Sequence, residues 1–416
     1  MRKALLILFA ASIFVACRLA TSVEMKATVA TRIAQTQTAV VQQIASPTAL
    51  SYAVLPTLMP PTQPTPEPLV LGGKEKVLLQ ISKCTPPEQP DCVVTPLGVY
   101  LAQADGSQQS TVADKAIFIG VDPQGEQCLI QPLTEGGVST SLVVVRLQDQ
   151  TQKTLTESYA ADYPCDSNRC GAIWLKDGKR IGLILKQKNV NYLDEKNIYL
   201  IQSGSLEQKQ LTQLGVDAPP MFLYQVNSDE FIYWEKDDQG IMGGTFSVSI
   251  DGGKISEIPL GVEKAFSPAG NLVAFQKKVN DLGYQTALMV AKLDGSEEKA
   301  IYTPQEGDEL KDYVWSPDGT QLVFDVTRCN PDCVPKRYLW KVGDEQPKEL
   351  QLPAGVLLRA PVWSPNGKFL LFITYDVQGK KYNYWASQVE SGQWQPMLTQ
   401  LNLPFGVFVD SIAVLP

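Results

Sequence analysis

The chain has 416 residues, of which 44% are hydrophobic and 19% charged, and its formal net charge at pH 7 is −8. It contains no histidine, which excludes the usual Ser-His-Asp and Cys-His catalytic groups and removes the commonest zinc ligand. With no cluster of basic residues and no Gly-rich phosphate loop, the sequence predicts no nucleic-acid partner, no cofactor and no metal.

The chain begins with the features of an export signal. The basic pair Arg2-Lys3 precedes an apolar run that is short for a membrane span and fits a cleaved leader. The run ends in Phe14-Val15-Ala16-Cys17, which resembles the lipobox of bacterial lipoproteins. The resemblance implies a signal peptide over residues 1–16 and lipidation of Cys17, although Phe14 stands where that family prefers leucine. The alternative is an ordinary secretory leader with an incidental Cys17.

Residues 17–73 are predicted to form a tether. Small and apolar residues recur every three or four positions over residues 24–45, which favours a helix of about 22 residues. Six prolines then fall within residues 56–68, a composition typical of an extended spacer. Anchor, helix and spacer together would hold the remaining domain, residues 74–416, away from the surface of the cell membrane on its extracytoplasmic side.

A five-residue segment recurs about every 48 residues in that domain, a period typical of stacked supersecondary units. Its clearest copies are Trp315-Ser316-Pro317-Asp318-Gly319 and Trp363-Ser364-Pro365-Asn366-Gly367. Four further copies begin at Val121, Trp174, Gln225 and Phe266, and the copies at Val121 and Gln225 are degenerate.

The segment has the chemistry of a hairpin turn. Proline presets φ, Asp or Asn bonds back to the backbone, and glycine takes the corner with positive φ. An alternating apolar strand follows each copy, and a third strand, a polar turn and a short fourth strand complete the repeat. Four antiparallel strands per repeat predict one blade of a β-propeller, with the leading Trp or Phe packed between neighbouring blades.

The Trp-Ser-Pro-Asp-Gly pattern and the strands around it resemble the TolB-like β-propeller repeat over residues 77–416. The resemblance implies an all-β propeller but no particular function. One further unit is split, with strands near residues 76–81 and 99–104 and after Gly106 at one end of the domain, and a strand near residues 405–415 at the other. Pairing the two ends would complete a blade and close the ring. We therefore predict seven blades, with six or eight as alternatives.

Six of the eight cysteines form close pairs, Cys84 with Cys92, Cys165 with Cys170, and Cys329 with Cys333. In an exported protein such pairs predict disulfides. Metal binding is disfavoured, because no second pair and no histidine would complete a tetrahedral site beside Cys329 and Cys333. Cys128 lies within an apolar strand and is expected to be a buried, unreactive thiol.

The longest loops follow the second strand of each unit and therefore lie on one side of the predicted propeller. They cover residues 186–196, 236–244, 278–285, 327–337 and 375–381. Cysteine pairs on this side would stiffen the loops and reduce the entropy lost on binding. This predicts a recognition surface, with Tyr192, Tyr284, Arg328 and Tyr375 as candidate contacts.

Three functions remain open. The first is a lipid-anchored, extracytoplasmic binding or scaffolding module for a protein, peptide or glycan. The second is a glycosidase or lyase that uses two carboxylates, and the acids near the predicted inner strands are Asp162, Asp217, Asp312 and Asp410. The third is a purely structural role in the cell envelope. A propeller peptidase is excluded, because the sequence has no Gly-x-Ser-x-Gly elbow and no histidine.

Overall fold

The computed structural model of the chain describes residues 75–416, with gaps at 86–92, 136, 161–170, 189–193, 215–219, 226–229, 237–241, 254, 259–261, 280–285, 306, 330–332, 354–355, 358–360 and 377–380. The predicted signal peptide, the lipidation site Cys17 and the tether lie outside the described residues. Within the described part, no helix is long and apolar enough to cross a membrane.

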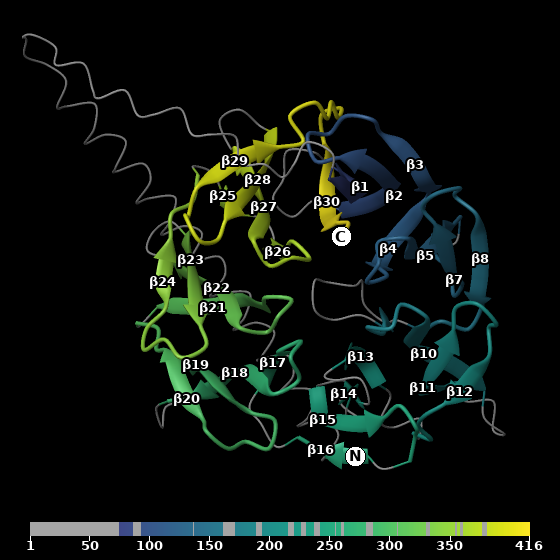
Figure 1. Ribbon diagram of the computed structural model, residues 1–416, viewed down its shortest axis with the longest axis horizontal. Helices are drawn as coiled ribbons and strands as arrows, with labels where there is room; N and C mark the ends of the chain where they lie inside the picture. Colours follow the sequence, from purple (N-terminus) through teal and green to yellow (C-terminus); the bar gives the residue numbers. More distant parts are fainter. Residues whose placement is uncertain are drawn as a thin grey trace, which may run out of the picture. The chain divides into compact units, whose positions relative to one another are not determined.

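The described residues form seven antiparallel sheets arranged as blades around a central axis (Figure 1). Blade 1 contains β30 (Val407–Val414), β1 (Lys76–Thr85), β2 (Val93–Gln103) and β3 (Ser110–Asp114). Blade 2 contains β4 (Ala116–Val121), β5 (Gln127–Thr134), β7 (Leu142–Arg146) and β8 (Gln152–Thr156), with the short β6 (Gly137–Val138) beside β5. Blade 3 contains β9 (Ala172–Trp174), β10 (Arg180–Lys188), β11 (Asp194–Gln202) and β12 (Gln208–Gln210).

The other four blades repeat the pattern. Blade 4 contains β13 (Pro220–Gln225), β14 (Glu230–Lys236), β15 (Met242–Ser249) and β16 (Ile255–Glu257), and blade 5 contains β17 (Val262–Phe266), β18 (Leu272–Lys278), β19 (Thr286–Lys292) and β20 (Lys299–Tyr302). Blade 6 contains β21 (Asp308–Trp315), β22 (Gln321–Cys329), β23 (Cys333–Lys341) and β24 (Lys348–Leu350). In blade 7, β25 (Val356–Leu357) and β26 (Val362–Trp363) both pair with β27 (Phe369–Asp376), which is followed by β28 (Lys381–Gln388) and β29 (Trp394–Met397).

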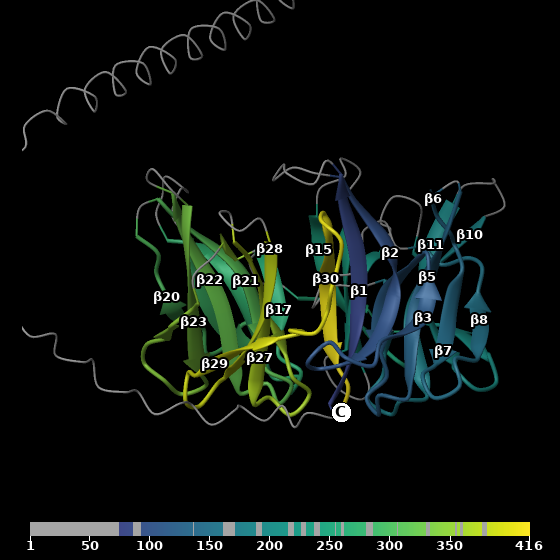
Figure 2. The same cartoon turned by 90° about the horizontal axis from the view of Figure 1, so that it is seen from above.

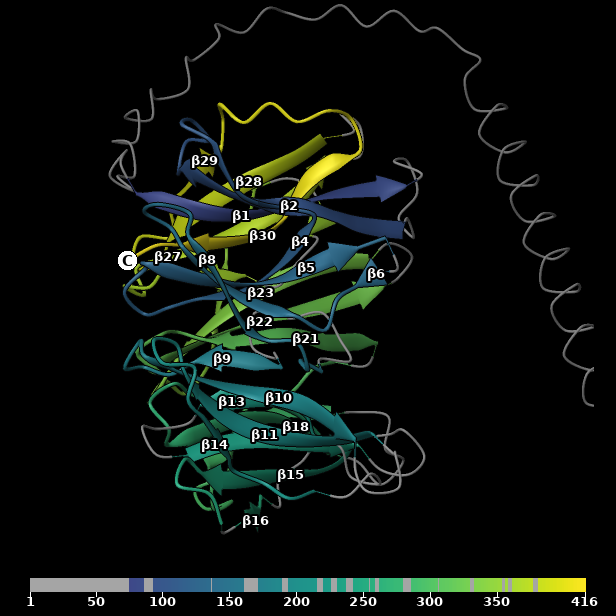
Figure 3. The ribbon, with the colours of Figure 1, turned by 90° about the vertical axis from the view of Figure 1, so that its right-hand side faces the viewer.

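The ring closes through the two ends of the domain, as predicted from the split repeat. Strand β30 pairs antiparallel with β1, with Val77 opposite Val414 and Lys83 opposite Val407. Figure 3 shows β30 lying alongside β1. Because β1 thereby gains a partner on both sides, closure removes the free edge that an unpaired strand would expose. The prediction of a seven-bladed all-β propeller is confirmed.

The recurring turn owes its shape to the side chain at its second position. In blade 6 the Ser316 hydroxyl donates to the Asp318 carboxylate at 2.6 Å and accepts the Gln321 N–H at 2.9 Å. The degenerate turn of blade 2 has Asp122 in the equivalent place, and one of its carboxylate oxygens accepts the N–H groups of Glu126 and Gln127. The same turn therefore forms without the Ser-Pro-Asp sequence, because an aspartate satisfies the same backbone donors.

The tryptophan that leads the motif packs between neighbouring blades, as predicted. The Trp315 indole N–H donates to the Ala265 carbonyl of blade 5 at 2.9 Å, and the Trp363 indole N–H donates to the Val314 carbonyl of blade 6 at 3.2 Å. Both rings are buried. Each tryptophan therefore joins one blade to the one before it by apolar contact and by a hydrogen bond.

Gly319 shows how closely the turns of adjacent blades approach. Its φ is 70°, and a Cβ there would collide with Ser267 Oγ and lie 2.8 Å from the Ala269 nitrogen. We expect Gly319→Ala to lower the free energy of unfolding by about 2–3 kcal/mol, from backbone strain and steric overlap together. Gly367→Ala is the matched control, because Gly367 has a φ of 68° and no contact nearer than 3.8 Å. Equal losses in urea unfolding of the two variants would contradict the packing argument.

The two ends of the propeller differ in the connections that they carry (Figure 2). We call the end with the glycine turns of the motif the turn end. We call the opposite end, with the connection between β27 and β28 and the start of β30, the loop end. The central parts of the predicted long loops, including Tyr192 and Tyr284, lie outside the described residues.

The cysteines are partly described. Cys84 is disulfide-bonded, and the register of β22 and β23 places Cys329 opposite Cys333. Opposed residues in an antiparallel pair have Cα atoms about 4.5–5.5 Å apart, within the range that a disulfide spans. Cys92, Cys165 and Cys170 lie outside the described residues, so the three pairings stay predictions.

Cys128 is a free, fully buried cysteine on β5. Burial raises the pKa of its thiol to about 12, so the thiolate that reacts with alkylating agents is scarce in the folded protein. We expect iodoacetamide at pH 8 not to label Cys128 until the chain is unfolded in urea.

The raised pKa of Cys128 also makes stability depend on pH. An unfolded thiol ionises near pH 8.5, so above that pH the unfolded state loses a proton that the folded state keeps. Ionisation of Cys128 in the unfolded state therefore lowers the free energy of unfolding as the pH rises from about 9 toward 12. Rapid labelling of Cys128 by iodoacetamide without denaturant would contradict its burial.

Candidate functional site

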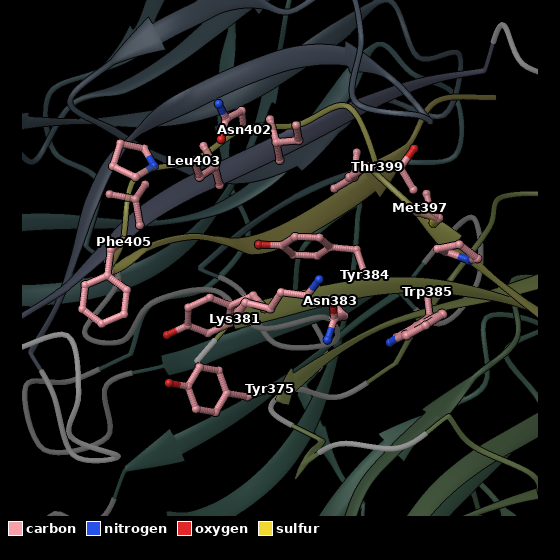
Figure 4. A pocket seen from close by; sticks show the side chains of 17 residues that line it. Tyr375, Lys381, Asn383, Tyr384, Trp385, Met397, Thr399, Asn402, Leu403 and Phe405 are labelled. Atoms are coloured by element: carbon pink, nitrogen blue, oxygen red, sulfur yellow. The ribbon is translucent and has the colours of Figure 1, made fainter. Parts of the chain in front are cut away.

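A pocket of about 590 Å³ lies at the seam between blade 7 and blade 1 (Figure 4). We call it the seam pocket. Its lining comes from the end of β27, from β28 and β29, and from the chain that leads to β30. The lining residues are Tyr375, Lys381, Tyr382, Asn383, Tyr384, Trp385, Pro396, Met397, Leu398, Thr399, Leu401, Asn402, Leu403, Pro404, Phe405, Gly406 and Val407.

The wall of the pocket is the segment of residues 398–406, which joins β29 to β30. At the turn end, the Leu398 N–H donates to the Ala104 carbonyl at 3.0 Å and the Gln400 N–H donates to the Asp105 carbonyl at 2.8 Å. At the loop end, the Gly406 carbonyl accepts the Cys84 N–H at 2.8 Å. The segment is thus fixed to blade 1 at both of its ends. Between them it runs from the turn end to the loop end beside β28, and the pocket lies between the segment and β28.

Gly106 lets blade 1 approach this wall closely. Its φ is 88°, and a Cβ there would lie 2.7 Å from the Leu401 nitrogen and 2.9 Å from the Leu401 Cβ. Glycine is therefore required at this turn for two reasons. Its φ is positive, which other residues rarely adopt, and Leu401 of the segment leaves no space for a side chain. The turn between β2 and β3 sets the position of the pocket wall.

Tyr384 forms the base of the pocket. Its side chain lies between β28 and the segment that carries Asn402, Leu403 and Phe405 (Figure 4). Tyr384 is 8% exposed, and its hydroxyl oxygen accepts the Val409 N–H at 2.8 Å. Burial raises the pKa of Tyr384 well above its ordinary value, so the phenol stays neutral and retains its own hydrogen for donation.

Aromatic rings gather toward the loop end of the pocket. Tyr382 stacks on Phe408, with 4.7 Å between ring centroids and 17° between planes. Tyr375 lies 5.1 Å from Tyr382 at 52°. On the opposite wall, Phe405 is 57% exposed, an unusual state for so large an apolar side chain. These rings give the pocket flat apolar surfaces with phenol groups at their edges.

Lys381 is the one charged residue among the described residues that line the pocket. It stands at the start of β28, opposite Asp376 in the register with β27, and Asp376 is not a lining residue. In a chain with a net charge of −8, a pocket whose described lining carries one positive charge and no negative one differs electrostatically from the protein as a whole. The remaining polar lining groups are uncharged.

The lining lacks the groups that hydrolysis or elimination by paired carboxylates would need. Among the residues that the structure describes, the lining contains no Asp, Glu, Cys or Ser, and the tyrosines and Lys381 are its titratable members. The indole N–H of Trp385 donates a hydrogen bond to the Thr374 hydroxyl oxygen at 2.9 Å. The arrangement offers stacking surfaces, hydrogen-bonding groups and one cation, which suits recognition of a ligand.

Tyr375 is the predicted contact residue that the structure places in this pocket. Arg328 lies in blade 6, where its guanidinium bonds the Asp308 carboxylate at 2.6 and 3.1 Å and Gln305 Oε1 at 2.6 Å. These bonds hold the pKa of Asp308 below its ordinary value. Tyr192 and Tyr284 lie outside the described residues.

The candidate carboxylates do not converge on the seam pocket. Asp312 lies on β21 and is exposed, with a φ of 52°. Asp410 lies on β30 and accepts a hydrogen bond from the Ser82 hydroxyl at 3.3 Å. Asp162 and Asp217 lie outside the described residues.

Comparison with known proteins identifies the fold and no family. No family model and no curated protein matches the sequence. Solved structures that resemble it include oligogalacturonate lyase from Vibrio parahaemolyticus, at 14% identity over 78% of this chain and 86% of that chain, with a TM-score of 0.52. The β-propeller domain of the Trilobed protease from Pyrococcus furiosus is 11% identical over 79% of this chain and 96% of that domain, with a TM-score of 0.52.

A prolyl endopeptidase also resembles the chain, at 10% identity and a TM-score of 0.55, over 82% of this chain and 51% of the endopeptidase. At such identities the likeness shows the fold alone. The class of protein is therefore a closed, seven-bladed β-propeller that resembles the propellers of a lyase and of peptidases. The finer resemblance to TolB-like repeats stays a prediction.

Proposed function

We propose that the protein is a binding module, tethered outside the cytoplasmic membrane through Cys17, that recognises its partner at the loop end of the propeller. The observation that carries the proposal is the seam pocket, whose described lining combines aromatic rings, phenol groups and one lysine and includes no carboxylate. Such a lining supports binding better than catalysis, because its described residues supply no paired acid and base.

The fold neighbours support no other function for this chain. One of them is named a lyase and another an endopeptidase, but activity depends on residues of the site and does not follow from the fold. The predicted glycosidase or lyase alternative would need two carboxylates about 5–10 Å apart around a bound sugar. Asp312 lies on β21 and Asp410 on β30, and neither lines the seam pocket.

A photo-crosslinking residue at position 405 tests the proposal. The full-length chain would carry the crosslinker in place of Phe405 in producing cells, and the matched control would carry it in place of Val342. Val342 is 48% exposed, and its N–H bonds the Thr320 carbonyl at the turn end. We expect a crosslinked species from position 405 and none from position 342. Equal crosslinking at the two positions, or none at position 405, would contradict recognition at the loop end.

A further inference from the structure

We propose that the seam pocket binds a carbohydrate that carries a carboxylate. This inference rests on the proposed function and names the ligand class for the same pocket. Three features of the lining support it: its aromatic surfaces, the free polar groups on its wall and its lone cation.

The aromatic surfaces match the shape of a sugar ring. A pyranose presents an apolar face of C–H groups and a rim of hydroxyls, so it needs a flat apolar surface beside hydrogen-bonding groups. Tyr375 and Tyr382 supply such surfaces on one wall, and exposed Phe405 supplies one on the other. The rings of Tyr375 and Tyr382 are carried by β27 and β28, contact each other at 52°, and Tyr382 also stacks on Phe408, so these two side chains lose little entropy on binding.

The segment that walls the pocket supplies polar groups for sugar hydroxyls. The side chains of Thr399 and Asn402 are exposed and form no hydrogen bond with the described part of the chain. A hydroxyl and an amide can each donate and accept, as sugar hydroxyls do. With the Tyr384 hydroxyl at the base, hydrogen-bonding groups stand on two sides of the aromatic surfaces.

The charge of the pocket selects an acidic sugar over a neutral one. Lys381 is exposed and forms no ion pair with any described residue. Asp376, which lies opposite it in the register, is engaged in an interaction of its own and does not line the pocket. An ammonium group that has no ion-pair partner among the described residues, beside neutral hydrogen-bonding groups, favours a ligand with a carboxylate.

A proline-rich peptide is the competing ligand for an aromatic groove. Such a peptide is recognised by ring stacking on its pyrrolidines, and it needs no cation. The isolated lysine therefore favours the acidic sugar, and the peptide becomes an outcome of the test.

The experiment measures binding of defined sugars to the full-length chain by titration calorimetry. The probes are short oligosaccharides of galacturonic, glucuronic and N-acetylneuraminic acid, each beside its counterpart with the carboxylates reduced to neutral hydroxymethyl groups. We expect at least one acidic probe to bind about tenfold more tightly than its neutral counterpart, the size expected of one charge-assisted hydrogen bond in a partly exposed site. Added salt should reduce this difference.

Variants locate the effect in the pocket. Lys381→Gln should abolish the preference for the acidic form, while Phe405→Ala should weaken both forms alike. Lys368→Gln is the matched control, because Lys368 is exposed next to the Gly367 turn at the opposite end. Thermal unfolding of each variant shows that the fold is retained.

The outcomes separate this inference from the proposed function. Equal affinity for acidic and neutral probes, or an unchanged preference in Lys381→Gln, would overturn the inference. Tighter binding of a polyproline peptide than of any sugar would also overturn it, and the loop-end binding module would stand. If no sugar binds but position 405 crosslinks to a partner, the acidic-sugar inference is wrong and the proposed function stands. If no sugar binds and position 405 does not crosslink, the proposed function is wrong as well.

Discussion

Replacing Asp325 by alanine should lower the free energy of unfolding by about 3–5 kcal/mol, the usual effect of leaving a buried charge without its partner. Asp325 and Arg337 face each other across β22 and β23, with paired N–O distances of 2.7 Å. They are 4% and 1% exposed. The alanine variant would leave the buried guanidinium without the carboxylate that balances its charge, in a place that water does not reach.

The position of the pair explains why its loss should affect more than one blade. The Arg337 guanidinium carbon lies 5.4 Å from the centre of the Phe372 ring on β27. The ion pair of blade 6 therefore also packs against blade 7, and the arginine gains attraction from the ring face. Loss of the carboxylate would leave Arg337 to move, and the contact with blade 7 would loosen.

Urea unfolding of matched variants measures the effect. Lys336→Ala removes an exposed pair of the same sheet, in which Lys336 Nζ lies 3.0 Å from Glu349 Oε2, and should cost less than about 1 kcal/mol. A double variant with Asp325→Leu and Arg337→Met removes both charges and should recover most of the stability that Asp325→Ala loses. If Asp325→Ala were no more destabilising than Lys336→Ala, the buried ion pair would not stabilise the propeller more than an exposed one does.

The propeller could be predicted because its determinants are local and repeated. The turn that contains Trp315 and Gly319 has its proline, aspartate and glycine within five residues, and these residues set the turn directly. Repetition then fixes the unit, and the split unit indicates closure. The turn at Asp122 departs further from the repeated sequence, because a carboxylate there replaces the serine hydroxyl without changing the geometry.

The buried ion pair and the seam pocket could not be predicted in this way. Asp325 and Arg337 are twelve residues apart, and only the register of β22 with β23 shows that they meet. The seam pocket depends on residues 398–406, which follow no repeat and are positioned by contacts with Ala104, Asp105 and Cys84. The sequence marks Tyr375 as a candidate contact because it flanks a long loop, but nothing in the sequence connects it with Lys381 and Phe405 as parts of one site.

Gln80 provides the second large effect that we expect. It is 5% exposed on β1, and its amide nitrogen donates to the Gly98 carbonyl at 3.0 Å and the Ala116 carbonyl at 3.2 Å. Its amide oxygen accepts the Phe118 N–H at 2.6 Å. One buried side chain thus satisfies backbone groups of β2 and β4 and joins blade 1 to blade 2.

Gln80→Leu keeps the volume of the side chain but leaves these backbone groups without partners. We expect a loss of about 3–4 kcal/mol in the free energy of unfolding, since each buried unsatisfied group costs about 1–3 kcal/mol and some will find water. Gln109→Ala is the control, because the Gln109 amide makes a single bond to the Gly106 carbonyl nearer the surface. Similar losses in the two variants would show that Gln80 does not join the blades.

Gln80→Glu separates the hydrogen bonds from the volume of the side chain. A carboxylate at position 80 could accept the Phe118 N–H but could not donate to Gly98 and Ala116, and burial would raise its pKa in the folded state. A raised folded pKa means that the folded state binds the proton more tightly than the unfolded state does. The variant's deficit relative to the natural protein should therefore be smallest below the unfolded glutamate pKa of about 4.3 and should grow as the pH rises through it. A deficit that is constant between pH 4 and pH 7 would contradict this account, because it would mean that the donors at position 80 are not what holds blades 1 and 2 together.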